Sequence, residues 1–170
     1  GSVGMVMTRL AIIDLRTGDQ PIYDPSGIAL IANAEIYNYI ELREQLGAIN
    51  FATQSDCEPP LHLYRQNGLS FADDLRGMYA IAIHDPAQGR LVLARDSFGI
   101  KPLYYVEKPE LFAFASEPRA LIESGLVKAD EDPEHRDELL QLQFTCGRNT
   151  IYKGISRVLP GETLEIRGAR

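Results

Sequence analysis

The sequence of 170 residues is poor in the residue types that build disulfide frameworks and metal sites. It contains only two cysteines, Cys57 and Cys146, which lie far apart and in no metal-ligand spacing. A disulfide framework is therefore not expected, and a reducing, cytoplasmic compartment is the simplest setting. The three histidines, His62, His84 and His135, lack metal-ligand spacing and any serine or cysteine partner, so we interpret them as packing or surface residues.

Long apolar runs and clustered basic charge are also missing. No apolar run approaches the length needed to span a membrane, and no signal peptide opens the chain. The formal net charge is -7, and a nucleic-acid-binding face would instead need gathered lysines and arginines. Neither a membrane nor a nucleic acid is therefore an expected partner.

The overall composition is that of an ordinary globular protein, with 45% hydrophobic and 24% charged residues. A chain of this length can bury a substantial core without disulfide or metal cross-links. We find no internal repeat, low-complexity tract or linker, so a single domain over residues 1–170 is expected.

Strand-like patterns are more frequent than helical ones. Runs of β-forming residues, several of them alternating between apolar and polar, are bounded by Gly, Pro, Asp or Asn. These runs cover residues 4–13, 28–36, 78–84, 90–94, 103–106, 111–115 and 162–166. Turn residues at 85–89 and 107–110 predict two hairpins, and residues 78–115 would then form one antiparallel meander.

Four segments have helical character. Asn38, Ser55 and Ser116 are candidate N-caps for the first three. The predicted helices cover residues 39–46, 55–67, 116–125 and 133–143. Strands grouped in meanders, with helices packed outside them, predict an α+β fold.

Three short polar clusters occur within this pattern. They are Arg9-Leu10-Ala11-Ile12-Ile13-Asp14, Asn33-Ala34-Glu35-Ile36-Tyr37-Asn38 and Ser55-Asp56-Cys57-Glu58. At these spacings they can build one pocket for a small amino acid, in which the planar guanidinium of arginine matches a carboxylate. Taken singly, Arg9 also fits a surface ion pair, Asn33 a turn or cap, and Asp56 a helix-dipole cap.

These clusters resemble the glutamine-hydrolysing domain of glutamine-dependent asparagine synthetases, a class II amidotransferase of the N-terminal-nucleophile hydrolase superfamily. The resemblance covers nearly the whole chain, and continues through Leu75-Arg76-Gly77-Met78-Tyr79-Ala80, residues 94–105 and Ser116-Glu117. It implies a four-layer αββα sandwich with mostly antiparallel sheets. Residues 150–155 and 159–162 resemble the segment that closes this domain before a synthetase domain.

The same resemblance implies a function. The chain is expected to be a glutaminase domain that supplies ammonia from glutamine to an ATP-dependent, asparagine synthetase-like domain at its C-terminal side. Glutamine and that synthetase domain are the expected partners, and a homodimer is a further possibility. No cofactor is expected in this domain, because ATP and magnesium would act in the synthetase domain.

By this resemblance, the first and third clusters recognise the two charges of the amino acid. Arg9 would bind the α-carboxylate of glutamine, and backbone groups of Leu10, Ile12 and Ile13 would form one side of the pocket. Asp56 would bind the α-ammonium group.

The second cluster would contribute the reactive end of the pocket. The amide of Asn33 and the backbone N–H of Ala34 would stabilise the oxyanion that forms when the carboxamide is attacked. Glu35 would support the ammonium side or order the strand. The family has glycine where this chain has Ala34, and we expect the added Cβ to intrude on the substrate, with strain if φ is positive.

The nucleophile is the second departure from the family. The family attacks with a cysteine that begins the mature protein, followed by Arg-Gly-Pro-Asp-Gly, whereas this chain begins Gly1-Ser2-Val3-Gly4-Met5. Cys57 and Cys146 are interpreted as packed structural thiols, so the chain as given is expected not to hydrolyse glutamine. The alternative is a non-catalytic scaffold domain, as in β-lactam synthetase-like proteins.

Overall fold

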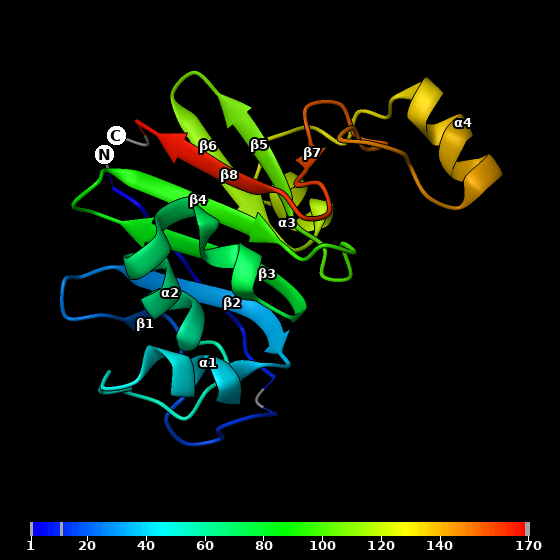
Figure 1. Cartoon of the computed structure of the whole chain (residues 1–170). Coiled ribbons are helices and arrows are strands. Elements are labelled where there is room, and N and C mark those ends of the chain that lie inside the picture. Colours follow the sequence, from blue (N-terminus) through cyan, green and yellow to red (C-terminus); the bar gives the residue numbers. More distant parts are fainter. Residues whose placement is uncertain (1, 11, 169–170) are drawn as a thin grey trace.

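Two antiparallel β-sheets dominate the computed structural model, which describes residues 2–10 and 12–168 (Figure 1). The larger sheet has the strand order β1-β2-β3-β4-β8 and the smaller one β6-β5-β7. The strands are β1 Ile22–Tyr23, β2 Ala29–Ile36, β3 Gly77–Asp85, β4 Arg90–Arg95, β5 Tyr104–Lys108, β6 Leu111–Ala115, β7 Ser156–Arg157 and β8 Thr163–Arg167. The helices are α1 Tyr39–Leu46, α2 Pro59–Asn67, the 3-10 helix η1 Gly68–Asp74, α3 Pro118–Glu123 and α4 Pro133–Leu142.

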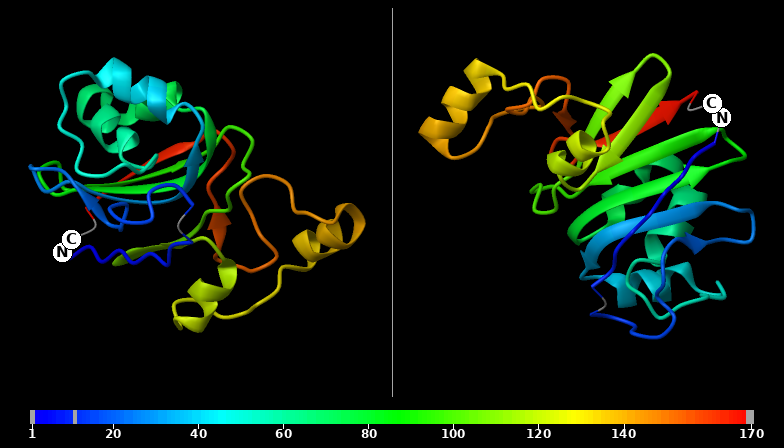
Figure 2. Two further views of the ribbon diagram at one scale, coloured as in Figure 1. Left: turned by 90° about the horizontal axis from the view of Figure 1, so that it is seen from below. Right: turned by 180° about the vertical axis from the view of Figure 1, so that it is seen from behind.

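The elements stack in four layers, which confirms the predicted αββα arrangement (Figure 2). Helices α1 and α2 cover one face of the larger sheet through a core that includes Leu30, Leu42 and Leu61. The opposite face packs on the smaller sheet, and α3 covers that sheet through Leu121 and Val106. Helix α4 buries none of its residues and lies to one side of these layers (Figure 1).

The alternation of β2 determines which of its side chains can reach a ligand. Leu30, Ala32 and Ile36 pack into the helix-side core, whereas Ile31 packs into the core between the two sheets. Successive side chains of a strand point to opposite faces, so the side chains of Asn33 and Glu35 share the face of Ile31. The sequence places two polar groups on the face that looks toward the smaller sheet.

The predicted strand over residues 4–13 is wrong. Exposure still alternates along this segment, with Met5 and Met7 packed against the inter-sheet core and Val6 exposed. Residues 4–10 and 12–13 nevertheless have no strand assignment, and residue 11 lies outside the described part of the chain. Alternation is a consequence of extended backbone and one buried face, and it does not require a hydrogen-bonded neighbour.

The single meander over residues 78–115 is also wrong, although both predicted hairpins are confirmed as β3–β4 and β5–β6. Strands β4 and β5 belong to different sheets. The carboxylate of Asp96, which is fully buried, accepts hydrogen bonds from the backbone N–H groups of Phe98, Ile100 and Lys101. This turn takes the chain out of the larger sheet after β4.

Helix α1 has the predicted bounds, whereas α2 and α3 begin later than predicted. Each starts at a proline, which suits the first turn of a helix because its N–H group would have no partner there. Ser55 and Ser116 are therefore not the N-caps. Asn38 precedes α1, but its side chain bonds to the loop at residues 74–76 and makes no cap hydrogen bond.

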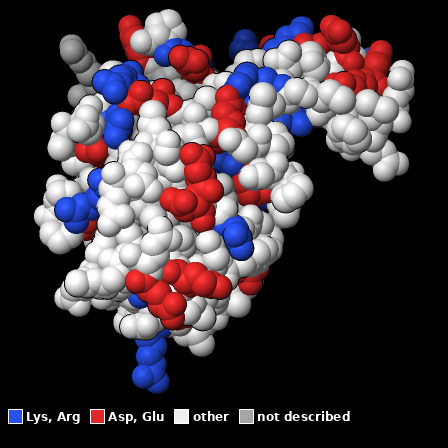
Figure 3. Space-filling view, viewed as in Figure 1, with Lys and Arg blue, Asp and Glu red and all other residues white. Residues whose placement is uncertain are grey.

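Charged side chains are distributed over the face shown in Figure 3 without a continuous basic area. Within residues 2–10 and 12–168, no helix combines the length and the apolar character needed to cross a membrane.

Candidate substrate-binding site

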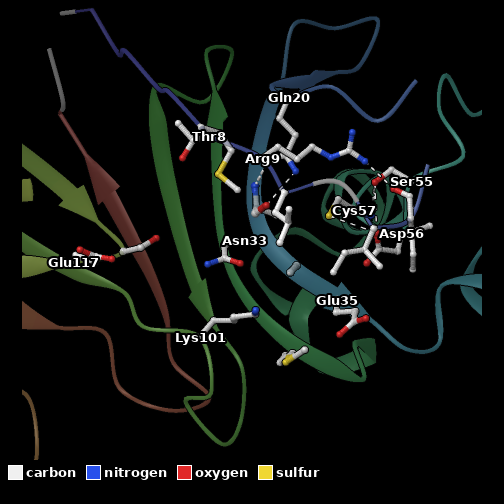
Figure 4. A pocket seen from close by; sticks show the side chains of 18 residues that line it. Thr8, Arg9, Gln20, Asn33, Glu35, Ser55, Asp56, Cys57, Lys101 and Glu117 are labelled. Carbon is white, nitrogen blue, oxygen red and sulfur yellow. Dashed lines mark hydrogen bonds between the residues drawn. The ribbon is translucent and has the colours of Figure 1, made fainter. Parts of the chain in front are cut away.

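All three polar clusters line one cavity of about 390 Å³ (Figure 4). Every candidate site residue named from the sequence contributes to it. These are Arg9, Leu10, Ile12, Ile13, Asn33, Ala34, Glu35 and Asp56. Residues that the sequence did not single out for a pocket also line it, among them Gln20, Lys101 and Glu117. The spacing along the chain spans 47 positions, from Arg9 to Asp56, and only the fold brings these groups together.

The edge of β2 provides an unusual backbone donor at the centre of the cavity. Strand β1 pairs only with Leu30 and Ala29, so within residues 2–10 and 12–168 the rest of this edge has no strand partner. Ala32 is bonded through both backbone groups to the Gln20 side chain, at 2.6 and 3.0 Å, and the N–H of Ile36 donates to Asp56 at 2.8 Å. Backbone groups alternate between the two edges of a strand, so the N–H of Ala34 points to the same open edge.

This N–H group has no acceptor among the residues that the structure describes. On either side of it along the edge, side chains make the hydrogen bonds that a neighbouring strand would make. The Gln20 side chain bonds to the backbone of Ala32, and the Asp56 carboxylate accepts the N–H of Ile36. A backbone N–H left free at a cavity wall is a donor already positioned for a ligand oxygen.

The methyl group of Ala34 does not intrude on the cavity in the way expected from the sequence. It packs against the helix-side core, on the face opposite the Asn33 side chain. Ala34 is not among the residues with positive φ, and it continues the regular pairing of β2 with Tyr79 of β3. Alanine is therefore accommodated without backbone strain at the position where the resembled family has glycine.

Arg9 is anchored at the opposite side of the cavity. Its Nη2 group donates to the backbone oxygens of Ile13 and Asp14, each at 2.7 Å, and its side chain is 16% exposed. The Nη1 group lies 3.8 Å from the exposed carboxylate of Asp19. Nη2 is used by the loop, whereas Nε and Nη1 have no hydrogen-bond acceptor among the described residues.

Two of the apolar residues after Arg9 have exposed side chains. Leu10 is 87% exposed and Ile12 is 69% exposed. Both residues nevertheless line the cavity, together with Ile13. That their backbone groups contact a ligand stays a prediction.

Asp14 fixes the Arg9 loop to the segment that carries Asp56. Its carboxylate accepts hydrogen bonds from the N–H groups of Thr17 and Gln54, each at 2.8 Å. Burial would raise the pKa of Asp14, but the hydrogen bonds from Thr17, Gln54 and Arg16 hold it well below its usual range. Asp14 adopts φ of 57°, which is consistent with a tight turn stabilised by its own side chain.

Asp56 is 4% exposed and reaches the cavity from the turn before α2. One carboxylate oxygen, Oδ2, accepts the N–H of Ile36. The second, Oδ1, lies 3.5 Å from the Ser55 hydroxyl and 3.8 Å from the Cys57 thiol, which are weak contacts. A buried carboxylate satisfied on one side only is suited to receive a cationic group of a ligand.

Glu58 stabilises the backbone that presents Asp56. Its carboxylate accepts the N–H groups of Ala52 and Thr53, each at 2.7 Å, and lies 3.3 Å from His62. Burial would raise the pKa of Glu58, but the hydrogen bonds from His62, Thr53 and Ala52 lower it to about 2. The residue is fully ionised at neutral pH and holds the 52–55 segment against α2.

The two cysteines differ from each other in the structure. Cys57 is 5% exposed, as predicted, and burial together with the charge of Asp56 raises the pKa of its thiol to about 12. Cys146 is exposed, so its interpretation as a packed thiol is wrong; it lies in the loop after α4, where a hydrogen bond with Glu138 raises its pKa. Neither thiol is activated for nucleophilic attack.

Known proteins share both sequence and fold with this chain. The family model for the glutamine amidotransferase domain matches residues 1–170. The chain is 47% identical over 120 residues to asparagine synthetase [glutamine-hydrolyzing] 2 of Bacillus subtilis, a match covering 70% of this chain and 16% of that protein. It is 40% identical to asparagine synthetase [glutamine-hydrolyzing] 1 of the same organism, covering 97% of this chain and 26% of that protein. The chain thus spans about a quarter or less of the length of these relatives.

Among solved structures, the chain is similar to the glutamine phosphoribosylpyrophosphate amidotransferase of B. subtilis determined with ADP and GMP. The TM-score is 0.62 at 24% identity, and the match covers 88% of this chain and 30% of the other. This likeness confirms the N-terminal-nucleophile type of fold that the sequence predicted.

Proposed function

Because the chain belongs to the glutamine amidotransferase domain family, we propose that its cavity binds L-glutamine and stabilises the oxyanion formed at the glutamine carboxamide. The observation that carries this proposal is the N–H of Ala34, which has no acceptor among the described residues and lies next to Asn33 on β2. As the carbonyl carbon of the substrate becomes tetrahedral, its oxygen gains negative charge, and two fixed donors lower the barrier by a few kcal/mol, roughly.

The remaining cavity residues account for recognition of a free amino acid. We assign the α-carboxylate to Nε and Nη1 of Arg9, and the α-ammonium group to the half-satisfied carboxylate of Asp56. Glu35 adds negative charge to the ammonium side from the same strand as Asn33. Opposite charges held on two separate segments distinguish a zwitterion from a simple amide.

In the wider protein, we propose that the ammonia released from glutamine is used by an asparagine synthetase-like domain that requires ATP and magnesium. The likeness to two glutamine-hydrolysing asparagine synthetases supports this assignment. For the residues of this chain, the proposed roles are substrate binding and oxyanion stabilisation. Cys57 and Cys146 have no part in them.

Titration calorimetry of the 170-residue chain with L-glutamine tests the binding site. Asp56→Asn keeps an acceptor for the N–H of Ile36 but removes the charge that meets the ammonium group, so we expect affinity to fall about tenfold or more. Asp73→Asn, an exposed change of the same charge, is the matched control and is expected to leave affinity unchanged. Equal affinity in wild type and Asp56→Asn would contradict the assignment. No binding to the wild type would favour the scaffold alternative.

A further inference from the structure

Lys101 is a cationic residue at the cavity that recognition of glutamine does not use. It lies in the loop between β4 and β5, and its ammonium group points into the cavity near Asn33 (Figure 4). In this view Asn33 projects between the side chains of Arg9 and Lys101. The cavity lining therefore includes a second cation besides Arg9.

The backbone of Lys101 is fixed from both sides. Its N–H donates to the buried carboxylate of Asp96 at 3.0 Å, and its carbonyl oxygen accepts from Nε of Arg95 at 2.8 Å. The other Arg95 donors hold the carbonyls of Gly99 and Val158, each at 2.7 Å. These hydrogen bonds fix the backbone position of Lys101. Its ammonium group can therefore reach only one region of the cavity.

The ammonium group itself has no polar partner in the part of the chain that the structure describes. No carboxylate of a described residue lies within 4.0 Å of it, although Glu35 and Glu117 line the same cavity. The side chain of Glu117 belongs to an exposed residue and stays in contact with water. An unpaired lysine in a half-buried position is available to an anionic group of a ligand.

Resting on the proposed function, we propose that Lys101 binds the side-chain carboxylate of L-glutamate, so that the cavity accepts an acidic amino acid as well as glutamine. In this proposal Arg9 holds the α-carboxylate, Asp56 holds the ammonium group, and the side chain of the bound amino acid reaches Lys101, which lines the same cavity. Hydrolysis converts glutamine and water into glutamate and ammonia, which replaces a neutral carboxamide by a carboxylate. Lys101 then retains the product and makes it a competitor of the substrate.

The two ligands differ in how strongly they depend on this lysine. A carboxamide oxygen accepts an ordinary hydrogen bond, whereas a carboxylate forms a charge-assisted one, which is about twice as strong. Lys101→Met removes the charge and keeps an unbranched side chain. We expect it to weaken glutamate binding by about tenfold and glutamine binding by about twofold or less.

The experiment is calorimetric titration of the whole chain with L-glutamate and L-glutamine in separate runs at low ionic strength. The variants are Lys101→Met, Lys101→Gln as a second neutral replacement, and Lys101→Arg, which is expected to retain most of the glutamate affinity. Lys128→Met is the matched control, because it makes the same change of net charge at an exposed residue outside this cavity. Far-ultraviolet circular dichroism confirms that each variant is folded.

A selective loss of glutamate affinity in both neutral variants, absent from Lys128→Met, supports the inference. Equal losses for the two ligands, or no loss for either, overturn it while leaving the glutamine site intact. If the wild type binds neither ligand, the proposed function fails and this inference fails with it.

Discussion

The ionised carboxylate of Glu58 is expected to contribute a large, pH-dependent part of the stability. Its side chain is 2% exposed, and its pKa is lowered from 4.5 to about 2 in the folded chain. At 1.36 kcal/mol per pKa unit, this shift corresponds to about 3 kcal/mol of stabilisation at neutral pH. Because the folded pKa is depressed, the contribution is complete above pH 4.5 and is lost as pH falls toward 2, with about 2 kcal/mol gone at pH 3.

Urea unfolding of wild type and Glu58→Gln at pH 7 and pH 3 measures this contribution. Glutamine has one acceptor oxygen and cannot hold the N–H groups of Ala52 and Thr53 through two carboxylate oxygens. The difference in unfolding free energy between the two proteins is therefore expected to shrink by about 2 kcal/mol between pH 7 and pH 3. Comparing two proteins at each pH cancels the titration of the other carboxylates.

Glu44→Gln, an exposed change on α1, is the control and is expected to show the same small difference at both pH values. If the difference for Glu58→Gln stays constant from pH 7 to pH 3, the carboxylate is not stabilised by these hydrogen bonds. The ionised carboxylate of Glu58 would then not be what holds the segment before Asp56.

Two glycines make further predictions, each from the space around a missing side chain. In Gly77→Ala, the new Cβ would lie 2.2 Å from the backbone oxygen of Glu35. The unfolding free energy measured in urea titrations should therefore fall by about 2–4 kcal/mol. A loss below about 0.5 kcal/mol would contradict the close approach of β2 and β3 at this glycine. In Gly18→Ala, the Cβ would lie 2.6 Å from Nη2 of Arg9 and displace its flexible end. Calorimetry should then show about tenfold weaker glutamine binding with stability within about 1 kcal/mol of wild type, and unchanged affinity would show that Arg9 does not meet the ligand.

Much of the fold follows from local pattern in the sequence. The apolar, β-forming runs of β2, β3 and β4 and the turn residues between the last two predict both the strands and their hairpin, because each signal acts within a few residues. The segment at residues 4–10 has alternating exposure but no strand assignment. Pairing depends on which chain segment lies alongside, and this information is absent from a local pattern.

Several residues of the candidate site could be named from the sequence. The contacts and directions of these residues depend on the tertiary fold. Asn33 and Asp56 could be named from the sequence, but no local signal shows that Gln20 replaces a strand beside Ala32. Nor does the sequence show that the Ala34 methyl faces the helices, because that direction follows from the register of β2. Lys101 was missed because its role depends on Asp96 and Arg95 fixing a loop between two sheets.

In the proposed complex, the backbone N–H of Ala34 meets the carboxamide oxygen of bound glutamine. This contact is tested most directly by following the assigned amide resonance of Ala34 in ¹⁵N–¹H correlation spectra during titration with L-glutamine. L-norvaline, which has the same α-amino acid end and no carboxamide, is the matched ligand. We predict that the Ala34 proton resonance moves downfield and saturates with glutamine but not with L-norvaline. Saturable binding of glutamine that leaves the Ala34 resonance unchanged, or that moves it equally with both ligands, would contradict the claim.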